Sequence, residues 1–424
     1  MNFYIYTLGC KVNTYESNIM RDILLNHGYK ENENADVVIV NTCTVTNTSD
    51  SKSLKIIRQV AKKNPDAIII VAGCMSQVNS DKLKDIKEIS IVIGNKNKTK
   101  IIDYIEKFKK EKKQIIDLVN VMDEPFETMI LNNFNRTRAF VKIEDGCENY
   151  CSYCIIPYSR GKVKSKDPKE ALDEIEQLVK QGHKEIVLTG IHTGHYGGDL
   201  ENFDFADLLN EIIKIKGLDR LRISSIEITE VNEKVLDVFR KSNILVDHMH
   251  IPLQTGNDKI LKLMNRKYDM NYFFKKINEI RSIRPNISIT TDVIVGFPGE
   301  TEEDFNETVT NIKKIKFTKV HVFPFSVRKG TKAENMPNHI DEVTKKKRVH
   351  ELLQVSKELE IEYMNKFLNQ EVEFIPETKK DGFIIGHTGN YLLIKVKDDN
   401  LIHEVEKIKI DKIEYPYCIG VKIC

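Results

Sequence analysis

The loop sequence Cys147-Glu-Asn-Tyr-Cys151-Ser-Tyr-Cys154 is the most informative part of the chain. Its C-x3-C-x2-C spacing lets a single loop wrap three thiolates around one metal centre. Three ligands on a four-iron cluster leave one iron open to bind a small molecule. Structural zinc prefers four closed ligands, usually as paired C-x2-C units, and no fourth partner is near in the sequence. The spacing therefore favours a catalytic iron–sulfur cluster over a structural zinc site.

The residues that flank this loop alternate short apolar runs with amphipathic stretches. Strands are predicted at residues 139–143, 185–189, 221–224, 248–251, 288–295 and 319–323. Helices such as 167–181, 205–216 and 271–283 separate them. Six βα repeats predict a partial (β/α)6 barrel of the TIM type. Active sites of such barrels lie in the loops after the strands, and the cysteine loop follows the first strand.

The first 95 residues predict another α/β unit. Buried strands are predicted at residues 3–7, 37–41 and 67–72, with helices at 13–27 and 49–63 between them. This order implies a parallel sheet of the Rossmann or flavodoxin-like kind. Cys10, Cys43 and Cys74 each follow one of these strands by a few residues. Because ligands bind open parallel sheets at the carboxyl ends of the strands, the three cysteines are expected to meet at one sheet edge.

The pattern divides the chain into four segments. They are a three-cysteine domain at 1–110, a charged linker at 111–136, the barrel domain at 137–360 and a small β-barrel at 361–424. Strands of the last segment are predicted at 372–375, 382–387, 391–397 and 405–410. Cys418 and Cys424 lie past the last of these and have no ligand-like spacing, so they are interpreted as incidental.

Composition limits the class of protein. Of the 424 residues, 41% are hydrophobic and 30% are charged, as in globular proteins. No run approaches the ~20 apolar residues of a membrane-spanning helix, and the start does not resemble a signal peptide. We therefore expect a cytoplasmic location, where eight cysteines serve better as metal or redox ligands than as disulfides. A net charge of +2 means that nucleic acid would have to bind local basic patches.

The cysteine loop resembles that of the radical S-adenosylmethionine superfamily. The single cysteines lie in three further motifs: Leu8-Gly9-Cys10-Lys11-Val12-Asn13, Asn41-Thr42-Cys43-Thr44-Val45-Thr46 and Ala72-Gly73-Cys74-Met75-Ser76-Gln77. With these motifs the whole chain, residues 1 to 424, resembles the methylthiotransferases. Their three parts are an N-terminal three-cysteine domain, a radical barrel and a C-terminal TRAM domain.

The resemblance implies two [4Fe-4S] clusters and S-adenosyl-L-methionine as cofactors. The cluster held by Cys147, Cys151 and Cys154 would yield a 5′-deoxyadenosyl radical from the bound cosubstrate. The cluster held by Cys10, Cys43 and Cys74 would deliver sulfur. A reducing partner of the flavodoxin or ferredoxin type would supply the electron.

Contacts with the cosubstrate are expected at the strand ends. The candidates are Tyr153, Thr189, Gly190, Ser224, Glu227, Gln254 and Asp292. The resemblance implies that the aromatic side chain of Tyr153 lies near the adenine of the cosubstrate. It also implies that the turn at Thr189 and Gly190 contacts the amino group of the methionine part. A plain packing role stays open for Tyr153, Gln254 and Asp292.

Three local sequence segments resemble those of the family members that act on N6-threonylcarbamoyladenosine at position 37 of tRNA. They are the residues after Cys10 and Cys43, and the segment Gly386-His387-Thr388 followed by Tyr391. The implied reaction is methylthiolation of C2 to give 2-methylthio-N6-threonylcarbamoyladenosine. The alternatives within the family are N6-isopentenyladenosine-37 of tRNA and a ribosomal protein aspartate. A remote alternative is a non-enzymatic, metal-containing RNA-binding protein.

We expect the C-terminal segment to hold the tRNA, since small β-barrels commonly bind looped RNA through basic and aromatic residues. Acidic residues slightly outnumber basic ones from residue 362 onward, so the lysine-rich stretch before it is expected to contribute. The candidates are Lys345, Lys346, Lys347, Arg348, Lys379, Lys380, Tyr391, Lys395 and Lys397.

Overall fold

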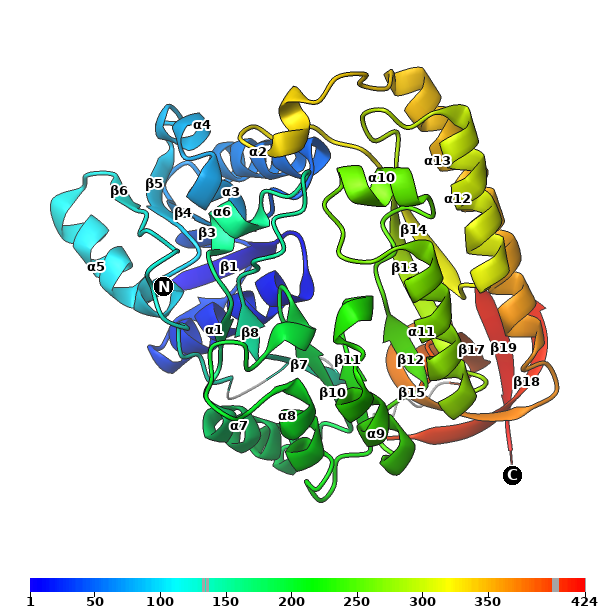
Figure 1. Cartoon of the computed structure of the whole chain (residues 1–424). Coiled ribbons are helices and arrows are strands. Elements are labelled where there is room, and N and C mark those ends of the chain that lie inside the picture. Colours follow the sequence, from blue (N-terminus) through cyan, green and yellow to red (C-terminus); the bar gives the residue numbers. More distant parts are fainter. Residues whose placement is uncertain (132–133, 135–136, 399–403, 424) are drawn as a thin grey trace.

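The computed structural model describes residues 1–131, 134, 137–398 and 404–423 (Figure 1). The chain begins with a six-stranded parallel sheet in the order β2-β1-β3-β4-β5-β6. Its strands are β1 (Asn2–Thr7), β2 (Lys30–Glu31), β3 (Val37–Thr42), β4 (Ile68–Gly73), β5 (Ile89–Ile93) and β6 (Ile115–Asp117). Its helices are α1 (Lys11–Asn26), α2 (Asn47–Lys63), α3 (Cys74–Val78), α4 (Asp81–Lys84) and α5 (Ile101–Glu111).

Helices cover both faces of this sheet. Alternate residues of β3 point to opposite faces, and every residue of the strand is buried. On one face Val38 and Val40 pack with Ile57 of α2. On the other face Ile39 packs with Met20 of α1, in a cluster that also includes α5. Continuous aliphatic strands are thus buried on both sides, which confirms the parallel sheet that the sequence predicts.

The first sheet extends past residue 110. β6 pairs with β5 in parallel through Ile91 and Ile115. The sheet therefore takes in part of the segment 111–136 that the sequence assigns to a linker. The strand is only three residues long and follows a charged helix, so its apolar signal is weak. Residues 132–133 and 135–136 of that segment lie outside the described residues.

The second part is an open barrel of six parallel strands, arranged as two three-stranded sheets in the orders β11-β10-β7 and β12-β13-β14. The strands are β7 (Arg138–Lys142), β10 (Glu185–Thr189), β11 (Arg220–Ile223), β12 (His248–His250), β13 (Ser288–Val295) and β14 (Lys319–Pro324). A bridge between Leu221 and Leu245 joins the two sheets. All six strands were predicted from the sequence within one or two residues of these bounds, and the barrel class is confirmed.

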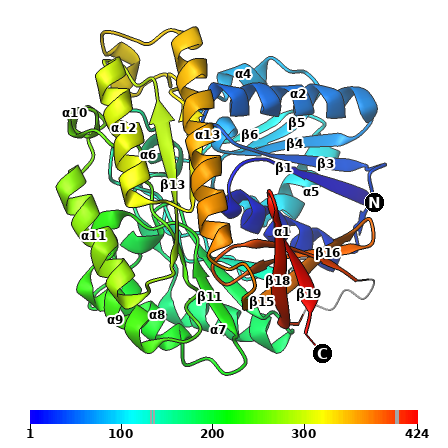
Figure 2. The ribbon, with the colours of Figure 1, turned by 90° about the vertical axis from the view of Figure 1, so that its right-hand side faces the viewer.

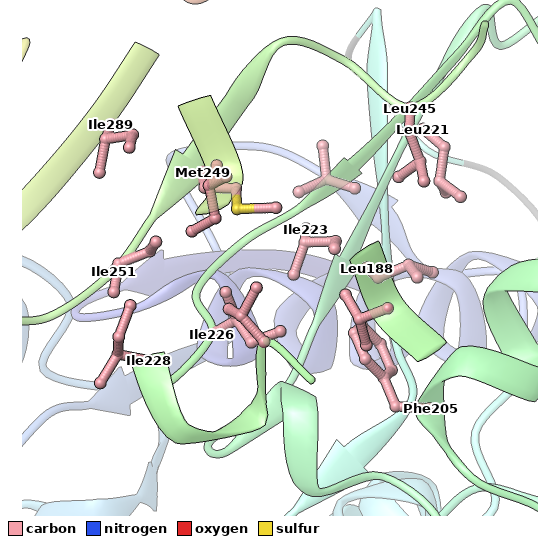
Figure 3. Packing of buried hydrophobic residues seen from close by; sticks show 14 of the residues in the cluster. Leu188, Phe205, Leu221, Ile223, Ile226, Ile228, Leu245, Met249, Ile251 and Ile289 are labelled. Atoms are coloured by element: carbon pink, nitrogen blue, oxygen red, sulfur yellow. The ribbon is translucent and has the colours of Figure 1, made fainter. Parts of the chain in front are cut away.

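Helices surround the barrel on its outer side (Figure 1). They are α7 (Pro168–Lys180), α8 (Phe205–Ile212), α9 (Glu233–Lys241), α10 (Asp258–Leu263), α11 (Met270–Ile283), α12 (Glu302–Ile315) and α13 (Glu342–Asn365). Figure 3 shows side chains of β10, β11 and β12 packed together, with Leu188 and Ile223 near Phe205 of α8. Fully burying one such side chain contributes about 1.5–3 kcal/mol, so this cluster holds the strand ends in place.

Shorter elements shape the loop after β7. The antiparallel pair of β8 (Glu144–Asp145) and β9 (Lys164–Ser165) encloses it, and α6 (Ile156–Arg160) lies within it.

The tail is a closed five-stranded barrel in the order β15-β16-β17-β19-β18. Its strands are β15 (Glu371–Lys380), β16 (Phe383–Thr388), β17 (Leu393–Lys397), β18 (Glu406–Glu414) and β19 (Tyr417–Lys422). β19 was not predicted from the sequence, because the strand follows Pro416 and has only two aliphatic side chains, Ile419 and Val421. Cys418 is therefore not beyond the last strand: it is a buried residue of the barrel core. Cys424 lies outside the described residues.

The tail barrel lies at the foot of α13, close to the barrel strands and α1 (Figure 2). Arg220 of β11 donates to Glu373 O of β15 at 3.0 Å, and Arg138 of β7 pairs with Glu377 at 2.9 Å. The tail therefore closes the amino end of the first barrel sheet. Within the described ranges, no helix has the length and apolar character needed to cross a membrane.

Candidate active site

Cys147, Cys151 and Cys154 lie in the loop between β7 and α6. Two backbone hydrogen bonds shape this loop. Cys147 N donates to Gly161 O at 3.0 Å, and Cys154 N donates to Cys151 O at 2.9 Å. The loop is thereby closed on itself, with its three thiols near one another.

The electrostatics of the three thiols fit a shared metal centre. Burial raises the pKa of Cys147, and the thiols of Cys154 and Cys151 raise it further. Burial and Cys151 also raise the pKa of Cys154 to about 12. No disulfide joins the cysteines within the described part of the chain. Neighbouring thiols that disfavour one another's ionisation become thiolates when a metal supplies positive charge between them.

Two residues that the sequence analysis did not select lie against this loop. Arg266 Nη1 donates to Cys151 Sγ at 3.1 Å, and the same guanidinium pairs with Glu227. His192 Nδ1 lies 3.8 Å from Cys147 Sγ, and its other ring nitrogen pairs with Glu230. Arg266 follows a short helix and so lies outside the strand-end rule. His192 follows β10 by three residues, and that position could have identified it.

A cavity of about 210 Å³ opens beside Cys154. It is lined by three of the predicted cosubstrate contacts, namely Tyr153, Gln254 and Asp292. Gln254 has a φ of 67°, and its N–H donates to Asp292 O while its carbonyl accepts from Ile294 N. Val45 also lines this cavity, two residues after Cys43. The cavity therefore connects the loop with the first domain.

A larger cavity of about 520 Å³ extends from Cys10 through the barrel to the tail. The predicted residues that line it are Thr189, Gly190, Ser224, Asp292 and Tyr391. Asp292 is common to both cavities. Glu227 lines neither cavity and lies in a crevice with Cys151 and Arg266. The structure thus groups the predicted cosubstrate residues around the two cavities and the cysteine loop.

The carboxyl edge of the first sheet brings the other three cysteines together. Cys10 precedes α1, Cys43 follows β3, and Cys74 begins α3 directly after β4. Burial raises the pKa of Cys43 to about 11, and the thiols of Cys74 and Cys10 add to this rise. Gly9 has a φ of 98°, and a Cβ placed there would lie 3.0 Å from Cys43 Sγ. This second group of thiols also fits a metal centre.

A buried polar network joins the two cysteine groups. Asn95 Nδ2 lies 3.5 Å from Cys74 Sγ and donates to Ser159 O of α6 at 2.7 Å. Arg160, at the end of α6, donates to Glu16 Oε1 at 2.7 Å and Asn13 Oδ1 at 2.9 Å. These contacts fix α6, which follows Cys154, against the first domain.

Two of the residues of α13 that were predicted to contact RNA are not on the surface, so this prediction is wrong for them. Lys345 and Arg348 are 5% and 3% exposed. Arg348 Nη1 donates to Glu300 Oε2 at 2.6 Å, and Lys345 lies over the Phe325 ring. The length of lysine and arginine side chains explains the error. A lysine-rich stretch of sequence is typical of a solvated helix face, but the aliphatic parts of these side chains can pack under a neighbouring loop. Lys346 and Lys347 are exposed, and Lys347 pairs with Glu302.

The predicted tail residues differ in their surroundings. Lys379, Lys380 and Lys397 are exposed, and Lys395 Nζ lies 4.1 Å from the Phe383 ring centroid. Tyr391 is packed between His248 and His387, with ring centroids 4.8 and 4.6 Å apart. Tyr391 is therefore part of the large cavity, whereas the lysines form the outer surface.

Comparison with protein families agrees with this geometry. Residues 141–312 match the model of the radical SAM superfamily, and residues 2–94 match that of the uncharacterized protein family UPF0004. The barrel and its three-cysteine loop are thus those of a radical SAM enzyme.

Curated relatives narrow the class. The chain is 42% identical to the threonylcarbamoyladenosine tRNA methylthiotransferase MtaB of Bacillus subtilis, over 98% of this chain and 95% of the relative. It is 38% identical to the protein of the same name from Thermotoga maritima, over 88% and 86% of the two chains. It is 35% identical to a tRNA-2-methylthio-N(6)-dimethylallyladenosine synthase of Clostridium botulinum, over 97% and 94%. The chain belongs to the tRNA methylthiotransferase family, whose enzymes use S-adenosylmethionine and [4Fe-4S] clusters.

Solved structures share the fold. The radical S-adenosylmethionine methyltransferase TsrM of Kitasatospora setae, with cobalamin and a [4Fe-4S] cluster bound, has a TM-score of 0.56 at 13% identity. That match covers 78% of this chain and 76% of the other. The cobalamin-dependent radical enzyme OxsB has a TM-score of 0.52 at 13% identity, over 85% of this chain and 56% of the other. At these identities the likeness concerns the fold alone.

Proposed function

We propose that this enzyme methylthiolates C2 of N6-threonylcarbamoyladenosine at position 37 of tRNA. The observation that carries the proposal is the lining of the larger of the two cavities. This cavity is lined by Cys10 of one cysteine group, by barrel residues such as Thr189 and Ser224, and by Tyr391 of the tail. A nucleoside in this cavity is within reach of all three parts of the chain. The 42% identity to an MtaB protein supports the choice of substrate.

The protein's own residues hold the reacting groups in place. Cys147, Cys151 and Cys154 would hold one cluster, and Cys10, Cys43 and Cys74 the other. Together with S-adenosylmethionine, the bound clusters supply the radical, the sulfur and the methyl group that no side chain can provide.

Positioning falls to the cavity walls. We assign the cosubstrate to the smaller cavity, where Tyr153 and Gln254 lie beside Cys154. Asp292 borders both cavities and so lies between cosubstrate and nucleoside. The tail packs against the amino end of the first barrel sheet, which would limit the entry of bulk water through that end and so help to protect a reactive intermediate.

The remaining partners follow from the same proposal. Exposed lysines of the tail and of α13, among them Lys346, Lys379 and Lys380, would contact the tRNA backbone. A flavodoxin or ferredoxin type of reductant would supply the electron. A reducing cytoplasm would keep the cysteines as thiols.

The competing substrate is the dimethylallyl form of adenosine-37, which the relative at 35% identity favours. Reconstituted enzyme is incubated anaerobically with a reductant, S-adenosylmethionine and tRNA that carries one or the other modification. Nucleosides are then identified by mass spectrometry. We expect the 2-methylthio product from threonylcarbamoyladenosine. Product from the dimethylallyl form alone would reject the proposal in favour of the competing substrate.

A further inference from the structure

One wall of the large cavity is cationic. Lys11 begins α1, Arg138 begins β7, and Arg222 lies on β11, yet all three line this cavity together with Tyr391. The guanidinium carbons of Arg222 and Arg138 lie 4.8 and 5.5 Å from the centroid of the Tyr391 ring. The three cations therefore surround one point where the first domain, the barrel and the tail meet.

Arg222 has a hydrogen-bond donor to spare. Its side chain is 2% exposed, and its Nε donates to Glu185 Oε1 at 2.6 Å. Nη2 lies 3.5 Å from Thr388 O. Nη1 is buried and has no hydrogen-bond partner in the described part of the chain. Buried guanidinium nitrogens are nearly always paired, so an unpaired Nη1 in a residue that lines the cavity indicates an acceptor that the described residues do not supply.

The charges of this wall do not balance. Glu185 forms ion pairs with both Arg222 and Arg220, and Glu377 forms an ion pair with Arg138. Glu377 also accepts a hydrogen bond from His387 Nδ1 at 2.7 Å. Lys11 has no ion pair with any described residue, so four cations share two carboxylates.

The titration of neighbouring groups reflects this excess of positive charge. Burial would raise the pKa of Tyr391, but Arg138, Lys11 and Arg222 bring it below its usual value. Burial lowers the pKa of His248 well below its usual value, and Arg222 lowers it further. An environment that favours a phenolate and disfavours an imidazolium suits an anionic ligand.

The opposite wall of the cavity is balanced. Lys319 pairs with Glu360 at 3.1 Å, and Asp292 lies 3.3 Å from His250. Selection of an anion is therefore confined to the side formed by Lys11, Arg138 and Arg222.

We propose that Lys11, Arg138 and Arg222 bind the carboxylate of the substituent on N6 of the target adenosine. This inference rests on the proposed function, and it names the residues that select the substrate. A threonylcarbamoyl group ends in a carboxylate, whereas a dimethylallyl group is neutral and apolar. A carboxylate gives Arg222 Nη1 its acceptor and offsets the charge of the wall. A dimethylallyl group would leave a buried donor unpaired, which a site penalises strongly.

The test compares two RNAs that differ only in this charge. One is an anticodon stem-loop with threonylcarbamoyladenosine at position 37, and the other carries its neutral carboxamide. Dissociation constants are measured with the reconstituted holoenzyme. We expect the carboxylate RNA to bind about tenfold to a hundredfold more tightly, as for a hydrogen-bonded charge pair. Equal affinities would overturn the inference.

Variants test which residues cause the difference between the two dissociation constants. Lys11→Met should reduce the ratio of the two dissociation constants, because Lys11 has no ion pair to break. The double change Arg222→Gln with Glu185→Gln should bring the ratio close to one, because it removes the donor without leaving a buried lone carboxylate. The matched control is Lys319→Met, a cation of the opposite wall, which should keep the wild-type ratio.

Two further outcomes separate the possible failures. If the variants weaken both RNAs equally and keep the ratio, the wall binds a backbone phosphate and the inference is wrong. A turnover assay on the same RNAs tests the proposed function by itself. Methylthiolation of both RNAs with equal affinity would contradict only the carboxylate site. Absence of product from either RNA, with product from a dimethylallyladenosine stem-loop, would reject both.

Discussion

At the scale of single residues, Arg160 is the centre of a buried ion network. Its side chain is fully buried between the two cysteine groups. Glu16, Asp145 and Asn13 accept hydrogen bonds from it, and Lys142 and Lys98 also pair with Glu16. A buried ion network tolerates the loss of one member badly, because the remaining charges stay buried without compensation.

Arg160→Met is therefore expected to destabilise the protein by about 3–5 kcal/mol. Urea unfolding under anaerobic conditions measures the change. Arg240→Met is the control: Arg240 is an exposed arginine of α9 with surface ion pairs, and its loss should change the free energy of unfolding far less than the loss of Arg160. Similar effects for the two variants would contradict a structural role for the buried network.

Glu300 provides a pH-dependent test at the same scale. Burial raises the pKa of its carboxyl to about 6, partly offset by Gly296 N–H and Arg348. Its Oε1 has no partner in the described ranges, so no hydrogen bond to that oxygen stabilises the ionised form. The folded state therefore binds a proton that the unfolded state releases near pH 4.5.

This contribution to stability is fully present below pH 4.5 and is lost as the pH rises through about 6. Between pH 4.5 and pH 7.5 the wild type should thus lose up to about 2 kcal/mol relative to Glu300→Gln, which does not titrate. Urea unfolding of both proteins across this range measures the difference. Parallel pH profiles would show that Glu300 does not titrate in this way.

At the scale of elements, the ends of three parallel strands gather Cys10, Cys43 and Cys74. The approach is close at Gly9, where a Cβ would lie 2.7 Å from Cys43 Cβ. The left-handed φ of 98° at Gly9 turns the chain from β1 into α1. A side chain at this position would push apart Cys10 and Cys43, which follow β1 and β3.

Gly9→Ala is expected to remove the second cluster and leave the first. Iron per chain should fall from about eight to about four if each site holds four irons. Gly28→Ala is a matched control, because Gly28 also has a left-handed φ of 80° but no atom lies within 4 Å of the added Cβ. Iron and sulfide analysis after anaerobic reconstitution measures both. Equal iron contents would show that the close contact at Gly9 does not matter.

The sequence predicted those elements whose signal is local. Aliphatic runs such as 288–295 gave the barrel strands, because burial on both faces requires continuous apolar residues. The strand-end rule then placed the six cysteines. The sequence analysis did not predict β2, β5, β6, β8, β9 and β19. β2, β6, β8 and β9 have only two or three residues, and pairing with a neighbouring strand, more than composition, makes them strands. β19 follows Pro416 and has few aliphatic residues, whereas β5 (Ile89–Ile93) is a buried aliphatic run whose local signal was overlooked.

Features that depend on distant contacts could not be predicted. Arg266 contacts Cys151, from which it is separated by more than a hundred residues in the sequence. Arg348 forms a buried hydrogen bond with Glu300. Arg222 on β11 looked like an ordinary strand residue, since the tail that encloses it is more than a hundred residues away in sequence. Long side chains that pair across domains carry no periodic signal of their own.

At the scale of the whole molecule, the proposed reaction needs two cysteine groups beside two adjoining cavities. Cys154 of the loop lines the smaller cavity, and Cys10 lines the larger one. Contacts of α6 with the first domain hold the two groups in a fixed relation. The two groups should therefore have separable roles, one in cosubstrate cleavage and one in sulfur delivery.

The most direct measurement follows both products in one anaerobic reaction with tRNA that carries threonylcarbamoyladenosine-37. Wild-type enzyme should form 5′-deoxyadenosine and the 2-methylthio nucleoside. Cys10→Ala should still form 5′-deoxyadenosine but no methylthiolated nucleoside, whereas Cys147→Ala should form neither. Methylthiolation by Cys10→Ala at the wild-type rate would contradict the central claim that two cysteine groups share the reaction.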